Sequence, residues 1–203
     1  VEPPIRVLGM SKFEQFEWKR EDLQAEGVTY SLKKFVSLLV KGNPTILSSV
    51  FSPYTYDEIG LTDPHFHSMF ISKKAGGHFI GYMQDQMRRL HSSKGLHVTR
   101  AELIKAHGYD TKYAAHVIRL GFQGIEYLSR GTITLPMTDT HLQVLHAIRN
   151  GGLTYEAFMR LAERTLEALN SVDAFSSLPE QPQYELLNEW LVEKYLNTWT
   201  GNE

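Results

Sequence analysis

The stretch GYDTKYAAHVIRLGFQGIEYLSRG, residues 108–131, predicts one long helix that begins after Asp110 and ends at Gly131. Its apolar residues recur at helical spacing and form the face that a helix buries: Val117, Ile118, Phe122, Ile125 and Leu128. Gly121 and Gly124 interrupt this pattern, although glycine costs about 1 kcal/mol relative to alanine in a helix interior. The two glycines therefore indicate close packing against a neighbouring element.

The opposite side of this helix carries a mixed polar stripe. Its members recur at steps of four, three, four and three, which at ~100° per residue places them within an arc of roughly 80°. They are Lys112, His116, Arg119, Gln123 and Glu126. A polar stripe of this kind most often faces water. Because this one mixes a histidine, two cations, an amide and a carboxylate, it is also a candidate wall of a binding site.

Capping residues predict further helices on both sides of this stretch. The expected ranges are 32–41 after Ser31, 45–51 after Asn43-Pro44, 72–91 after Ser72, 99–107 with a Thr99/Glu102 capping box, 139–150, 154–170 after Thr154, and 184–199. Extended segments are expected at 5–8 and 27–30, with a charged surface excursion over 11–27 and a loop over 52–70 that contains one short turn of helix. The sequence thus predicts a mostly helical α+β protein.

The predicted helix 72–91 carries a second polar line. His78, Tyr82, Gln86 and Arg89 recur at steps of four, four and three, and the apolar residues of this helix lie on another side. A line at this spacing occupies one face of a helix. The two polar lines predict facing walls of one cleft.

The composition of the 203-residue chain limits the classes of function. A net charge of -2 argues against an extended nucleic-acid groove, which is normally strongly basic, whereas small anions stay possible ligands. The absence of cysteine excludes disulfides, thiolate zinc sites and a cysteine nucleophile. No apolar run reaches the ~20 residues of a membrane span and no signal peptide is present, so a cytoplasmic protein is expected. Because residue 1 is Val, a segment upstream of it is also expected.

Five ordered blocks of the sequence resemble one known family. They are YSLKKFVSLLVKGNPTILSSVFSP at 30–53, SKKAGGHFIGYMQDQMRRL at 72–90, GYDTKYAAHVIRLGFQGIEYLSRGTITLPM at 108–137, IRNG at 148–151 and SSLPEQP at 176–182. The chain resembles the predicted nucleotidyltransferases of the DNA polymerase beta superfamily, in the branch associated with RNA-repair genes and also seen in phages. The blocks cover nearly the whole chain.

This resemblance implies a two-part architecture. Residues 1–53 would be the C-terminal part of a minimal nucleotidyltransferase core, with a remnant of its sheet, and residues 54–203 a helical domain. Family members begin with a Gly-Ser turn and an Asp-x-Asp pair, which would lie upstream of Val1. A third metal-binding acid would be Glu26, where Asp is usual; alternatively, Glu26 is a surface residue before a strand. Ser48 stands where the family has another acid.

The resemblance also implies the activity and its residues. The family moves a nucleoside monophosphate from an NTP to a hydroxyl acceptor, such as an RNA or tRNA end, with two Mg²⁺ (or Mn²⁺) ions. Glu26 would be the catalytic, metal-binding residue of this chain. The nucleotide would be held by Lys112, His116, Arg119, Gln123, Lys73, Lys74, Tyr82, Gln86 and Arg89.

Two alternatives stay open from the sequence. The first is a catalytically inactive nucleotide-binding or assembly module, which the departures at Glu26 and Ser48 favour. The second is a sequence-specific DNA-binding helical protein, although no helix is rich in Arg, Lys and Asn as a recognition helix would be.

Overall fold

The structure is a computed structural model, and it describes residues 14–92 and 100–200. This part of the chain forms nine helices and one two-stranded antiparallel hairpin, which confirms the mostly helical α+β prediction. The elements are β1 Gln15–Arg20, β2 Ala25–Tyr30, α2 Leu32–Val40, α3 Pro44–Val50, α4 Pro64–Phe70, α5 Lys74–Ser92, α6 Ala101–His107, α7 Thr111–Arg130, α8 Asp139–Arg149, α9 Tyr155–Phe175 and α10 Tyr184–Thr200.

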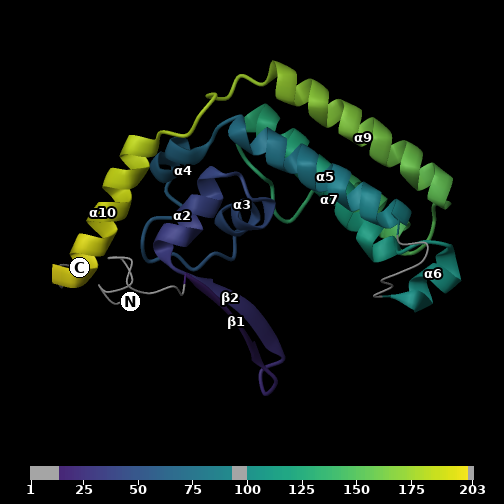
Figure 1. Cartoon of the computed structure of the whole chain (residues 1–203), viewed down its shortest axis with the longest axis horizontal. Helices are drawn as coiled ribbons and strands as arrows, with labels where there is room; N and C mark the ends of the chain where they lie inside the picture. The colour runs from purple at the N-terminus through teal and green to yellow at the C-terminus, as the bar shows by residue number, and fades with distance from the viewer. Residues whose placement is uncertain (1–13, 93–99, 201–203) are drawn as a thin grey trace.

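The helix predicted from 108–131 is the centre of the helical body. Helix α7 packs against α5 and α9 (Figure 1). Helix α8 also packs against α7. A Cβ atom added to Gly121 would lie 2.4 Å from Thr165 Cγ2 of α9, and one added to Gly124 would lie 2.9 Å from Phe79 Cβ of α5. The structure therefore confirms that the two glycines mark close helix packing.

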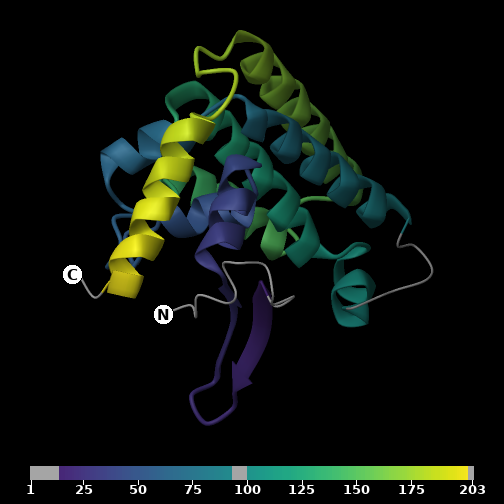
Figure 2. The same ribbon diagram turned by 60° about the vertical axis from the view of Figure 1, so that its left-hand side comes forward.

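The hairpin projects from the helical body on the side away from α9 (Figures 1 and 2). Gln15 pairs with Tyr30 at its base, and Arg20 pairs with Ala25 next to the turn. The surface excursion expected over 11–27 thus contains a complete strand, and β2 begins before the predicted residue 27. The segment predicted to be extended at 5–8 lies outside the described residues.

Helices α2, α3, α4 and α10 form the other end of the body. The Lys33 amide donates a 3.2 Å hydrogen bond to the Tyr195 hydroxyl, which ties α10 to the start of α2. A single buried cluster reaches from Val36 through α7 to Leu187. The proposed boundary at residue 53 stays a prediction.

Most of the predicted N-caps are present in the structure. The side chains of Ser31, Asn43, Asp110 and Thr154 accept hydrogen bonds from the first turns of their helices. Helix α4 lies in the predicted loop over 52–70 and begins with an Asp63-Pro64 pair. The predicted Thr99 cap lies outside the described residues, and α6 begins at Ala101. Among the described helices, none combines the length and the apolar character that a membrane span requires.

Candidate functional site

A pocket of about 610 Å³ lies along α7, between α3, α8 and the connection that precedes α8. Its polar lining consists of Lys112, His116, Arg119, Gln123, Thr45, Ser48, His146 and Arg149. Its apolar lining consists of Pro44, Ala115, Leu120, Leu135, Pro136, Met137, Leu142 and Leu145. The volume is within the usual range of small-molecule sites.

Four residues of the predicted polar stripe meet in this pocket. Lys112, His116, Arg119 and Gln123 all line it, as their common face on α7 requires. The fifth member, Glu126, instead accepts a 3.0 Å hydrogen bond from the Thr134 amide, and the Thr134 hydroxyl also donates to it. Glu126 thereby holds the connection whose residues 135–137 form one wall of the pocket.

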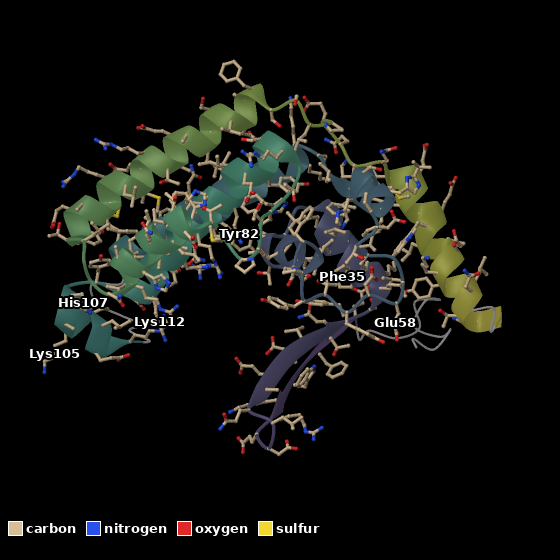
Figure 3. All side chains as sticks on the ribbon, turned by 180° about the vertical axis from the view of Figure 1, so that it is seen from behind. Phe35, Glu58, Tyr82, Lys105, His107 and Lys112 are labelled. Carbon is tan, nitrogen blue, oxygen red and sulfur yellow. The ribbon has the colours of Figure 1, made fainter. Side chains whose placement is uncertain are left out.

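The pocket gathers positive charge without a compensating acid. Among the described residues, no aspartate or glutamate lines it, and none forms an ion pair with Lys112, Arg119 or Arg149. These three cations are exposed to solvent, and Figure 3 shows Lys112 on the side of the body away from α9. In a chain of net charge -2, such a concentration favours an anionic ligand.

His116 and Arg119 form a pair within the pocket. The Arg119 guanidinium donates to His116 Nδ1 over 2.9 Å, so this nitrogen carries no proton in that arrangement. Burial lowers the pKa of His116, and the positive charge of Arg119 lowers it further. The imidazole is therefore neutral at pH 7 and presents its Nε2–H as a donor.

A hydrogen bond between two lining residues, Gln123 and Ser48, joins α7 to α3 within the pocket. Gln123 is 4% exposed, and its Nε2 donates a long hydrogen bond of 3.4 Å to the Ser48 hydroxyl. Ser48 is the residue that stands in place of the acid expected from the family resemblance. Its hydroxyl leaves the pocket without a negative charge at this position.

The remaining predicted nucleotide-binding residues lie outside this pocket. Lys73 pairs with Glu180 at 2.6 Å, while Lys74 Nζ contacts the Tyr184 hydroxyl and lies 5.1 Å from that ring's centroid. Arg89 of α5 contacts the Tyr113 hydroxyl.

Tyr82, which Figure 3 labels, is 42% exposed. The side-chain oxygen of Gln86 is buried and has no hydrogen-bond partner among the described residues. No residue of α5 lines the pocket, so the two polar lines are not facing walls of one cleft, and the opposite wall is α8. The roles of the α5 residues in nucleotide binding stay predictions.

Glu26, the predicted metal-binding acid, lies far from these residues along the chain and in the fold. It is exposed on β2, opposite Lys19 in the hairpin, and does not line the pocket. The described residues contain no group of three histidine, aspartate or glutamate side chains that would hold a metal ion. The donor set in this part of the chain thus does not fit a two-metal centre.

His146 and Arg149 are the site residues that sequence reasoning missed. Their helix, α8, is fixed against the start of α7 because the Thr111 hydroxyl donates to the Arg149 carbonyl oxygen over 3.0 Å. A cation near the C-terminus of a helix is common because it interacts favourably with the helix dipole. The position of Arg149 in the sequence therefore gave no reason to expect a binding role. The signal that identifies it is its i, i+3 spacing from His146 on the face that also carries Leu142 and Leu145.

Comparison with known families identifies the family of the chain. The profile of the RNA repair pathway DNA polymerase beta family, RlaP, matches residues 1–193. The chain therefore belongs to that family, as its sequence blocks predicted. No curated protein and no solved structure matches it. Membership suggests a nucleotidyltransferase, and proteins of this family typically use divalent metals and NTP substrates.

Proposed function

We propose that this protein is a nucleotidyltransferase of RNA repair and that the pocket along α7 binds its NTP. The observation that supports this most directly is the set of Lys112, Arg119 and Arg149, which share one pocket with no acidic lining residue among those described. Apolar residues complete the lining, so the pocket suits a ligand with an anionic part and a flat, less polar part. A nucleotide has both parts.

Each polar group of the pocket has a defined task in this proposal. The two arginines hold phosphate oxygens through charge-assisted hydrogen bonds, which their planar groups can make in pairs, and Lys112 adds a point charge. The neutral His116 donates Nε2–H to a phosphate oxygen. The rim of the pocket partly covers the exposed Arg119 side chain and lowers its pKa, but Arg119 remains protonated because an arginine pKa stays far above neutrality.

The proposed overall reaction is the one that family membership suggests. The acceptor hydroxyl gives its proton to a base, its oxygen bonds to the α-phosphorus, and the bond from that phosphorus to the bridging oxygen breaks. Pyrophosphate leaves with the electron pair of the broken bond. We assign the described residues to binding and orienting the NTP for this step, since they supply no two-metal donor set.

A catalytically inactive nucleotide-binding module is the second candidate. The exposed position of Glu26 and the neutral Ser48 in place of the family's acid favour it. Both candidates use the same pocket. They differ in whether the full-length protein transfers NMP to an RNA end when Mg²⁺ is present.

Calorimetric titration of the full-length protein with ATP, GTP, CTP and UTP tests the shared part of the proposal. Lys112→Ala, Arg119→Ala and Arg149→Ala should each weaken binding by about tenfold or more, the cost of one charge-assisted hydrogen bond. Arg160→Ala is the matched control, because Arg160 is exposed on α9 and does not line the pocket. Unchanged affinity in all three pocket variants would refute the site.

A further inference from the structure

The pocket has two chemically different ends along α7. The hydrogen bond from Thr111 to the Arg149 carbonyl places the C-terminus of α8 beside the N-terminus of α7. Lys112, His116 and Arg149 therefore gather at one end. Gln123 lies eleven residues after Lys112, which corresponds to a rise of ~16 Å along the helix.

The end near Gln123 is apolar apart from the Gln123 amide and the Ser48 hydroxyl. The hydrogen bond between the Thr134 amide and Glu126 brings the 135–137 connection alongside the later turns of α7. The rings of Phe122 and His141 stack with their centroids 4.2 Å apart, so the start of α8 lies beside this part of α7 and its lining residue Leu142 also belongs to this end. Charged phosphates would lose hydration here without compensation, whereas an aromatic base would bury apolar area.

Gln123 offers hydrogen-bonding capacity that the protein leaves unused. Within the described part of the chain, only its Nε2 is engaged, by Ser48, and its carbonyl oxygen has no hydrogen-bond partner. This oxygen is not sealed from solvent although Gln123 is 4% exposed, so a ligand or water in the pocket can reach it and bond to it. An amide presents a donor and an acceptor side by side, and the edge of a nucleobase presents the complementary pair.

We propose that the nucleotide lies lengthwise along α7, with its phosphates at the Lys112 and Arg149 end and its base at the far end, hydrogen-bonded to Gln123. This orientation rests on the proposed function of the pocket. It assigns Gln123 to recognition of the base and the cations to recognition of the triphosphate. Gln123 then determines how strongly the pocket prefers a nucleotide over a bare polyphosphate.

The experiment compares ATP, ribose 5-triphosphate and inorganic tripolyphosphate on the full-length protein by calorimetry. Wild-type protein should bind ATP about tenfold or more tightly than either ligand that lacks the base. Gln123→Met keeps the shape of the side chain and removes its amide, so it should weaken ATP binding about tenfold and leave tripolyphosphate binding within about twofold. The control variant Lys112→Ala should weaken the binding of all three ligands in parallel.

The possible outcomes separate this orientation from the function itself. Equal wild-type affinity for ATP and both base-free ligands, with the Lys112 effect intact, would overturn the orientation and leave an anion-binding pocket. Loss of ATP and tripolyphosphate binding in equal measure in folded Gln123→Met would overturn it too. The comparison of ligands on wild-type protein decides the matter even when the variant fails to fold. No binding of any of the three ligands would instead refute the proposed function.

Discussion

Replacing Gly121 by alanine tests how tightly α7 is held in the helical body. The added Cβ would lie 2.4 Å from Thr165 Cγ2 and 3.1 Å from Met83 Sδ. Thr165 cannot easily move, because it is 6% exposed and its hydroxyl donates to the Leu161 carbonyl over 2.8 Å. The substitution must therefore displace α9 from α7 or force a side chain from its preferred rotamer.

The expected cost follows from two opposing effects. Overpacking of a core lowers the free energy of unfolding by about 1–3 kcal/mol, whereas replacing glycine by alanine in a helix raises it by about 1 kcal/mol. We expect Gly121→Ala to lower the free energy of unfolding by up to about 2 kcal/mol, which corresponds to a fall in Tm of up to roughly 8 °C for a chain of this size. Urea and thermal denaturation monitored by circular dichroism measure both quantities.

Gly77 provides the matched control for this experiment. It also lies in a helix, α5, but no heavy atom comes within 4 Å of the Cβ that alanine would add. Gly77→Ala should leave the unfolding free energy unchanged or raise it by up to ~1 kcal/mol. A Gly121→Ala protein as stable as Gly77→Ala would refute the packing argument.

A second substitution identifies the responsible contact. Thr165→Ser removes Cγ2 and keeps the hydroxyl that donates to Leu161. In combination with Gly121→Ala it should be less destabilising than the sum of the two single changes, with a coupling of about 0.5 kcal/mol or more. Additive effects would show that the strain lies elsewhere.

Three further predictions concern the titrating groups and the start of α7. Burial raises the pKa of Asp57, but hydrogen bonds from Thr62 and its neighbours outweigh this and lower the pKa to about 2, so the stability that Asp57 contributes should be complete above pH ~4 and lost as the pH falls toward 2. Urea denaturation of wild type and Asp57→Ala across that range measures this, and a pH-independent difference would contradict it. In NMR titrations the pKa of His116 should lie below the ordinary value of ~6.5 and rise toward it in Arg119→Ala, which removes a nearby positive charge; no change on this substitution would disprove the coupling. Asp110 accepts a 2.9 Å hydrogen bond from the amide of Tyr113, so Asp110→Ala should lower the unfolding free energy by about 1–2 kcal/mol, and Asp110→Asn by less. Equal losses in the two Asp110 variants would argue against the capping role.

Helices and their caps were predictable because their signals are local. Asp110 and Thr154 lie next to the turns they cap, and the periodicity of α7 is visible within one stretch of sequence. Strand β1 was missed because its sequence is charged and exposed, which does not suggest a strand. Its extended conformation depends on hydrogen bonding to β2. Only one short helical turn was expected where α4 lies, although Asp63-Pro64 carries the same start signal as Asn43-Pro44.

Half of the candidate site was predictable, and the other half depends on tertiary structure. The spacing of Lys112, His116, Arg119 and Gln123 fixes their common face, so one wall of the pocket follows from α7 alone. The helix opposite that wall is determined by tertiary packing, and the sequence of α7 alone carries no information about it. The polar line on α5 therefore predicted the wrong partner, and α8 supplies the opposite wall.

A crystal structure of the full-length protein bound to a non-hydrolysable NTP analogue tests the central claim most directly. The account predicts a triphosphate within hydrogen-bonding distance of Lys112, Arg119 and Arg149, in the pocket between α3, α7 and α8. A nucleotide bound elsewhere, with this pocket empty, would contradict it.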